Sequence, residues 1–236
     1  MGHRAVSGGI GRSLKRVTVV RALRMGLLGV LAALFATLGL SLAVDATYTP
    51  VCASRPAAGT VIAAPGERME IVSPARARDD VLALDVVRDP FPIVDYALPA
   101  EHGHIHPLQE ERFEVVSGRA RFLIGEEYVE LGPGDVGVVP PDTVHHWMAL
   151  DDQPVRVTAF FAPALDVDQW FLNFERELQA GNMDLLQAAV ISREFEGAPL
   201  PVSPPPAVMN LLVRVLAPIG RALGYRACPA GDAASR

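Results

Sequence analysis

Three of the six histidines in this chain lie within five residues, at His102, His104 and His106, and a pair of glutamates follows them. Side chains two apart in an extended strand project from the same face, so His104 and His106 are expected to point together. Glu111 is expected to face the same interior from the next strand. A buried carboxylate is costly unless its charge is compensated, and a cation would compensate it. These residue types at this spacing therefore predict a metal site.

A second pair of histidines, His145 and His146, follows a double proline turn further along the chain. Imidazole and carboxylate ligands together suit one divalent transition metal, Fe, Mn, Zn, Ni or Cu, with coordination positions left open for water or substrate. Three histidines and Glu111 would form such a set. The alternative is that the histidines are structural and the interior holds no metal.

The elements that must position these residues are predicted to be strands. Short runs rich in Val, Ile, Leu and Phe are separated by Gly, Pro or Asp. The predicted strands are 69–72, 81–87, 112–116, 119–124, 128–131, 136–139 and 155–161. Their number and spacing indicate a mainly β domain, built as an antiparallel sandwich or barrel.

The hydrophobic period becomes helical in the C-terminal third of the chain. A helical pair is expected within residues 164–196, with the first helix over 166–179 and the second capped by Asn182. The apolar faces of this pair are expected to serve packing.

Beyond the pair, the proline-rich residues 197–206 predict a stiff spacer. A final amphipathic helix is expected over residues 207–226, kinked or interrupted at Pro218. Its apolar face is expected to dock on the domain or on a partner subunit. The alternative is that this helix lies on a membrane surface.

The N-terminal part of the chain predicts a membrane segment. Residues 25–44 carry no charge and would form a helix about 30 Å long, which matches the hydrocarbon thickness of a bilayer. The preceding region, 1–24, is basic, which places the N-terminus in the cytoplasm and the remainder outside. We expect a single-pass anchor in the cytoplasmic membrane; the alternative is a cleaved signal peptide and secretion. Residues 45–65 are expected to form a linker.

The charged residues are unevenly distributed around this segment. The first 44 positions contain six of the 21 basic side chains and none of the 27 acidic ones. The remainder has 15 basic and 27 acidic side chains, a net charge of −12. We therefore expect no nucleic-acid partner.

The chain has two cysteines, Cys52 and Cys228, near opposite ends of the part expected outside the cell. In an oxidising compartment the two are able to pair. The alternative is two ordinary free thiols, and the sequence alone does not choose between them.

The two histidine segments resemble the two motifs of the cupin superfamily. The first is similar to HxHx(4)Ex(6)G at His104, His106, Glu111 and Gly118, and the second to Gx(5)PxGxxH at Gly134, Pro140 and His145. The chain departs from the family pattern at Leu98, Asp142 and Ala149, where the pattern often has Gly, Gly and Asn. None of these three positions is a ligand in that pattern.

The resemblance implies a single cupin-type antiparallel jelly-roll barrel, which we place over residues 66–163. The patterns described above add C-terminal α-helices and an N-terminal transmembrane or signal helix to it. It also implies a homodimer. The implied metal ligands are His104, His106, Glu111 and His145. His102 does not fit the register of the motif, and His146 alternates to the other face of its strand.

Two functions are compatible with this metal site. The first is a metal-dependent enzyme of the oxygenase or decarboxylase class that acts on a small oxygenated molecule. The alternative is a non-catalytic module that binds a small molecule or a metal at the cell surface. The apolar residues Phe113, Phe122 and Trp147 are candidates for the wall of a substrate pocket, although core packing explains each of them equally well.

Overall fold

The computed structural model describes residues 55–90 and 103–228, together with Cys52 and scattered positions between residues 25 and 43. The chain divides into two compact units, Met1–Thr47 and Tyr48–Arg236. The predicted membrane segment 25–44 lies mostly outside the described residues. Among the described residues, no helix has both the length and the apolar character needed to span a bilayer. The candidate site lies in the second unit.

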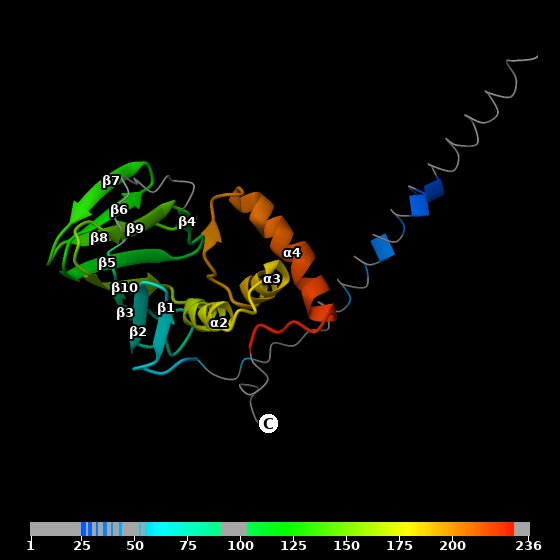
Figure 1. Cartoon of the computed structure of the whole chain (residues 1–236), viewed down its shortest axis with the longest axis horizontal. Helices are drawn as coiled ribbons and strands as arrows, with labels where there is room; N and C mark the ends of the chain where they lie inside the picture. The colour runs from blue at the N-terminus through cyan, green and yellow to red at the C-terminus, as the bar shows by residue number, and fades with distance from the viewer. Residues whose placement is uncertain are drawn as a thin grey trace, which may run out of the picture. The chain divides into compact units, whose positions relative to one another are not determined.

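The second unit is mainly β, and its described strands form two antiparallel sheets (Figure 1). The six-stranded sheet has the order β1-β2-β3-β10-β5-β8. Its strands are β1 (Val61–Ala64), β2 (Glu67–Ser73), β3 (Leu82–Arg88), β10 (Val155–Ala162), β5 (Glu110–Ser117) and β8 (Val136–Val139). The five-stranded sheet has the order β11-β4-β9-β6-β7. Its strands are β11 (Leu200–Pro201), β4 (His104–Ile105), β9 (His145–Ala149), β6 (Ala120–Ile124) and β7 (Glu127–Leu131).

Side chains of both sheets meet in one hydrophobic core. On β5 the alternation buries Glu111, Phe113 and Val115, as the two-residue period predicts. Phe113 packs against Phe122 of β6, with ring centroids 5.0 Å apart, and Phe122 stacks on Trp147 of β9 at 5.7 Å. Burial of each such side chain stabilises the fold by roughly 1.5–3 kcal/mol. The aromatic cluster therefore fixes the two sheets face to face beside the ligand strands.

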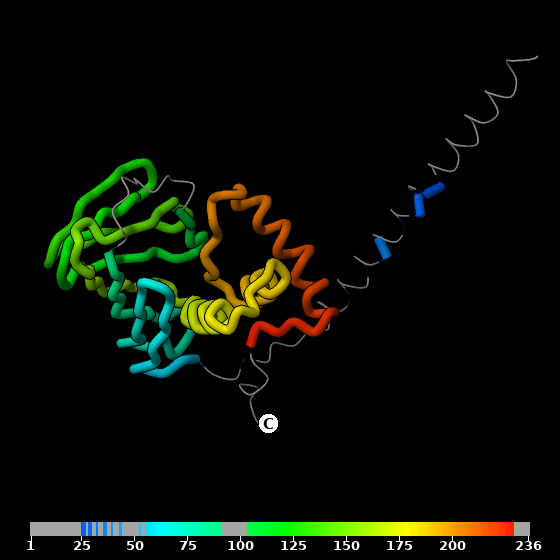
Figure 2. The backbone as a smooth tube through the Cα atoms, viewed as in Figure 1, coloured from blue at the N-terminus to red at the C-terminus, as the bar shows by residue number. Residues whose placement is uncertain are grey.

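Three helices follow the strands: α2 (Val167–Gln179), α3 (Leu185–Glu194) and α4 (Pro206–Ala222). Figure 2 shows α3 and α4 side by side, and their buried faces form a second core that includes Val190, Ile191 and Ala217. The cap of α3 is Asp184, whose carboxylate accepts from the Gln187 amide, and not Asn182 as predicted. The helix α4 continues through Pro218, so of the two predicted effects, a kink or an interruption, the interruption does not occur.

Two short strands lie where the sequence indicated no secondary structure. β1 lies inside the predicted linker 45–65 and pairs with β2, with Val61 opposite Glu70. β11 lies inside the predicted proline spacer and pairs with the ligand strand β4, with Pro201 opposite His104. Both strands are stabilised by partners distant in sequence, which a local propensity does not detect.

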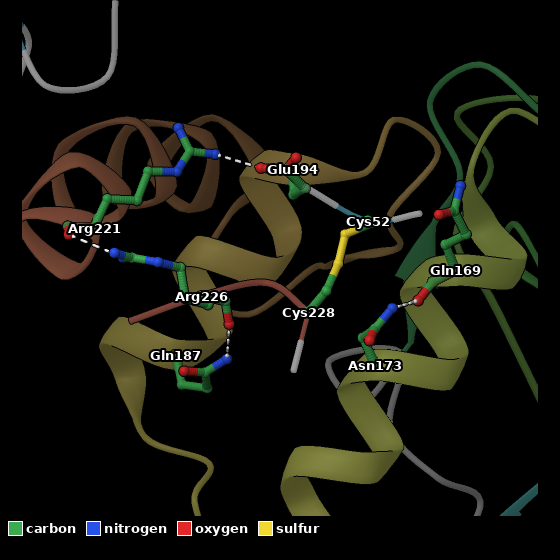
Figure 3. Close-up of a disulfide and its surroundings, with 8 residues drawn as sticks. All are labelled: Cys52, Gln169, Asn173, Gln187, Glu194, Arg221, Arg226 and Cys228. Atoms are coloured by element: carbon green, nitrogen blue, oxygen red, sulfur yellow. Dashed lines mark hydrogen bonds and ion pairs between the residues drawn. A yellow bond between two sulfur atoms is a disulfide. The ribbon is translucent and has the colours of Figure 1, made fainter. Parts of the chain in front are cut away.

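A disulfide joins Cys52 to Cys228, with Cα atoms 5.6 Å apart and a sequence separation of 176 residues (Figure 3). The two cysteines are therefore paired and not free. Beside the disulfide, Arg221 of α4 forms a buried ion pair with Glu194 of α3 at 2.9 Å. The bridge thus ties the segment that precedes β1 to the end of the helical region.

Candidate metal centre

The centre is built on the pairing of β4 with β9, where His104 and His145 are direct partners. Their ring centroids are 4.3 Å apart. His106 follows β4, and its ring lies 5.1 Å from His104 and 5.6 Å from His145. Two neighbouring strands of the five-stranded sheet, with the residue that follows the first of them, therefore supply all three imidazoles.

Glu111 approaches the three histidines from the other sheet, on β5. Its Oε2 lies 2.7 Å from Nε2 of His145 and 3.7 Å from Nε2 of His106. The four side chains His104, His106, Glu111 and His145 place one ligand atom each within 4.8 Å of one another. The site therefore bridges the two sheets.

Backbone carbonyls and a side-chain amide decide which nitrogen of two rings faces the centre. Nδ1 of His145 lies 2.9 Å from the Thr143 carbonyl oxygen, which only accepts, so Nδ1 carries a hydrogen. Nδ1 of His106 likewise donates to Gln109 Oε1 at 3.1 Å and to the Gly197 carbonyl at 3.3 Å. In both rings Nε2 is therefore directed at the centre.

Burial sets the charge of two of the imidazoles. Burial, reinforced by the neighbouring His145 and His106, holds the pKa of His104 well below its usual value. Burial also lowers the pKa of His106, and the opposing charge of Glu111 offsets it only in part. Both rings are therefore neutral at pH 7, which is the form that binds a metal.

His145 differs because it contacts Glu111 directly. Burial lowers the pKa of His145, but the hydrogen bond and the negative charge of Glu111 outweigh burial, so that the pKa is raised. A proton shared between Nε2 and Oε2 accounts for their 2.7 Å contact. A cation bound at the centre would take the place of this proton.

The centre fits a divalent transition metal. Nε2 of His106 is buried and has no hydrogen-bond partner among the described residues, although its ring is fixed through Nδ1. A buried ring nitrogen with a free lone pair is costly unless it binds something. Three imidazoles and one carboxylate at these separations are the ligands expected for Fe, Mn, Zn, Ni or Cu.

A cavity of about 480 Å³ reaches the centre, because His104 and Glu111 belong to its wall. Much of the remaining wall is apolar, and it comes from the strands and from the helices. The apolar lining includes Met69, Leu84, Val86, Phe113, Trp147, Phe161, Trp170, Phe171, Phe174 and Met209. A volume of this size matches a small organic ligand and not a macromolecule.

Besides the candidate ligand Glu111, the charged residues of the cavity wall are Arg88, Glu67 and Glu175. Arg88 pairs with Glu67, donates to the Trp147 carbonyl and lies over the Trp147 ring, 3.8 Å from its centroid. Burial, with a smaller contribution from the charge of Glu67, raises the pKa of Glu175. The wall therefore presents a neutralised ion pair and a carboxyl that gains a proton more readily than usual.

The structure places each predicted site residue. It brings His104, His106, Glu111 and His145 together, and Phe113 and Trp147 line the cavity. Phe122 packs behind Trp147 and is not part of the described cavity wall. His146 is buried, 6.3 Å from the ring of Tyr128, and does not join the four ligands. His102 and Leu98 lie outside the described residues.

Two sets of residues near the centre had no signal in the sequence. Gln109 stands between two specified positions of the first motif. Its hydrogen bond to the candidate ligand His106 depends on the folded backbone and is not indicated by the sequence. The aromatic residues of α2, Trp170, Phe171 and Phe174, follow a helical period that indicated packing, whereas they also line the cavity. A local pattern does not distinguish a side chain that packs on a core from one that faces a cavity.

Comparison with known proteins finds a family match over the segment that holds the centre. A model of the family described as a cupin domain matches residues 98–161, the segment that contains all four candidate ligands. No curated protein matches the chain.

Several solved structures are similar to part of the chain. KdgF from a Halomonas species is 28% identical, with 42% of this chain and 81% of KdgF covered and a TM-score of 0.35. An RmlC-like cupin from Shewanella frigidimarina is 16% identical, with 45% and 85% covered and a TM-score of 0.36. A mutant of Bacillus subtilis oxalate decarboxylase is 20% identical, with 44% and 27% covered and a TM-score of 0.35. The family match supports the cupin superfamily for the β region that holds the candidate metal centre.

Proposed function

We propose that this chain is a metal-dependent enzyme built on a cupin jelly-roll barrel. One divalent transition metal binds through His104, His106, Glu111 and His145, whose ligand atoms lie within 4.8 Å of one another. The observation that carries the proposal is that two of these ligands, His104 and Glu111, also line the cavity. A molecule in the cavity therefore reaches the metal.

The substrate class that we propose is a small, mainly apolar molecule with at least one oxygen donor. The oxygen donor faces the ligands, and the apolar body packs on the aromatic wall that includes Phe113, Trp147 and Phe171. A bound metal would act as a Lewis acid on that oxygen or bind dioxygen, which is the chemistry of the oxygenase and decarboxylase classes. The apolar wall excludes water from the reacting end.

The alternative is a non-catalytic module that binds the same kind of molecule. It is favoured by the pairing of Arg88 with Glu67, because the two charges in the wall neutralise each other and are not directed at a bound molecule. A screen of the full chain, loaded with each of the five metals, tests the choice. Small phenols and carboxylic acids would be offered as substrates, and their turnover would be measured as oxygen uptake and carbon dioxide release. Glu111→Gln serves as the inactive reference. Turnover that the variant lacks supports the enzyme, and saturable binding without turnover selects the module.

We further propose that the second unit lies outside the cytoplasmic membrane, anchored by residues 25–44, with secretion after cleavage as the alternative. The disulfide between Cys52 and Cys228 supports export, because such bonds persist in oxidising compartments. Retention of the chain in membranes after a carbonate wash tests the anchor. Release of a shortened chain selects cleavage.

A homodimer completes the proposal. Among the described strands, β8 stands last in its sheet, and its residues Val136 and Val138 are exposed, as is Val116 of the neighbouring β5. An exposed apolar strip on an edge strand is a common contact between subunits. Light scattering on the parent and on Val136→Glu/Val138→Glu tests it, since the pair of substitutions should yield monomers. A parent that is already monomeric contradicts the dimer.

A further inference from the structure

The buried amide of Gln109 lies beside a candidate ligand, at a position of the first motif where the pattern specifies no residue type. Gln109 is only 1% exposed, and its hydrogen bonds within the described residues are to buried or partly buried groups. Nε2 donates to the carbonyls of Pro163 and Ala164, both at 2.9 Å. Oε1 accepts from Nδ1 of His106 at 3.1 Å. Both hydrogens and the oxygen of the amide are therefore in use.

This network allows one orientation of the amide. If the amide were reversed, its oxygen would face the carbonyl oxygens of Pro163 and Ala164, and its hydrogens would face Nδ1 of His106. Two acceptors cannot satisfy each other, so the reversed orientation loses two hydrogen bonds. The oxygen is thus held toward His106, which keeps the hydrogen of that ring on Nδ1 and leaves Nε2 free.

A second acceptor for the same hydrogen comes from the loop after α3. The Gly197 carbonyl lies 3.3 Å from Nδ1 of His106. Gly197 has a φ of +91°, and a Cβ added there would lie 2.9 Å from Oε1 of Gln109. The close approach of this loop to Gln109 therefore requires a glycine.

We propose that Gln109 is a positioning residue for the metal centre, and that it fixes His106 with Nε2 directed at the metal. The carbonyls that accept from Gln109 and from His106, those of Pro163, Ala164 and Gly197, lie beyond residue 161, where the family match ends. The loops that border α2 and α3 are therefore part of the metal centre and do more than cover the cavity. This inference rests on the proposed metal site.

The test measures the affinity of the full chain for Zn²⁺ by competition with a chromophoric chelator. Gln109→Met removes the acceptor and both donors, and loss of such a partner typically weakens metal binding about 10–100-fold. Gln109→Glu also loses the donors to Pro163 and Ala164 but keeps an oxygen facing Nδ1, so its affinity should lie within about tenfold of the parent. Gly197→Ala should weaken binding as well, because its new Cβ displaces Oε1 of Gln109.

Matched controls separate positioning from general loss of structure. Gln187 is also a buried amide, 6% exposed, and it donates to the Arg226 carbonyl away from the centre. Gly181 has a φ of +72° with open space around it. Gln187→Met and Gly181→Ala should lower the melting temperature of the chain but leave Zn²⁺ affinity within twofold of the parent.

The state of the His106 ring gives a readout that general destabilisation would not change. Two-bond ¹H–¹⁵N correlation spectra of the Zn²⁺-loaded chain should show Nε2 as the bound nitrogen and Nδ1 protonated in the parent and in Gln109→Glu. In Gln109→Met a mixture is expected. A parent that binds Zn²⁺ while Gln109→Met has unchanged affinity and an unchanged ring overturns the inference alone. A parent that does not bind Zn²⁺ overturns the metal site and the inference together.

Discussion

Oε2 of Glu111 lies 2.7 Å from Nε2 of His145, although the two residues stand on strands of different sheets. The short contact is compatible with a shared proton, and the same two atoms would both face a bound metal. The candidate centre thus joins the two sheets across their interior. Metal binding at this pair therefore competes with the shared proton and connects the two sheets.

Metal affinity should therefore depend on pH through His145. The hydrogen bond and charge of Glu111 outweigh burial and raise the pKa of His145. Because only the neutral ring binds a metal, Zn²⁺ affinity is complete above the raised pKa and falls about tenfold per pH unit below it for each proton displaced. Calorimetry in buffers of different ionisation enthalpy should show proton release on binding. An affinity that does not change between pH 5.5 and 8 would contradict this coupling.

The turn glycines Gly118 and Gly134 should differ in their tolerance of alanine. Both have a positive φ, but a Cβ on Gly118 would lie 2.8 Å from the Pro154 carbonyl oxygen, whereas Gly134 has open space. Gly134→Ala should cost about 1–2 kcal/mol from its backbone conformation alone. Gly118→Ala should cost more, because backbone atoms must also move. Urea unfolding of the two variants measures the difference, and equal losses would show that the close approach is unimportant.

The disulfide should contribute strongly to stability. The two cysteines are 176 residues apart in sequence, and for a loop of that length the chain-entropy model gives a stabilisation of about 5 kcal/mol. Cys52→Ser/Cys228→Ser should lower the free energy of unfolding by up to that amount in urea titrations. Reduction of the parent should reproduce the loss, while the double variant should not respond to reductant. No change on reduction would contradict a structural role for the bridge.

The cap of α3 should give stability a defined pH dependence. The hydrogen bond from the backbone N–H of Gln187, followed by that from the Tyr225 hydroxyl, lowers the pKa of Asp184 from its ordinary 3.8. A lowered pKa in the fold means that the contribution is complete above about pH 4 and is lost as the pH falls through the folded-state value. The stability difference between the parent and Asp184→Asn should therefore shrink below pH 4. The substitution Asp79→Asn, at an exposed aspartate, serves as control. A stability difference between the parent and Asp184→Asn that grows below pH 4 would contradict the prediction.

Much of the candidate site was predictable because its ligands lie in two short motifs. The alternation on β5 predicted that Glu111 faces inward, and the family pattern singled out His145 over His146. Even a departure from the pattern has a physical explanation. Asp142 replaces a glycine of the pattern and adopts a φ of 59°, a conformation in which Asp is tolerated better than most residues.

Other features depended on contacts between distant segments. The strand β11 forms in a proline-rich segment because Leu200 and Pro201 pair with β4. Gln109 contacts His106 in a buried site whose other members come from the loops after β10 and α3. The wall formed by Trp170, Phe171 and Phe174 required knowledge of where α2 packs. None of these relationships leaves a periodic signal in the sequence.

The metal content of the purified full chain tests the central claim most directly. Elemental analysis of the parent, Glu111→Gln, His145→Ala and the exposed neighbour control Glu110→Gln compares the site with the surface beside it. The parent and Glu110→Gln should each carry about one divalent transition metal ion per chain, as expected for a single three-histidine and carboxylate site. Glu111→Gln and His145→Ala should carry almost none, and equal metal content in all four proteins would contradict the site.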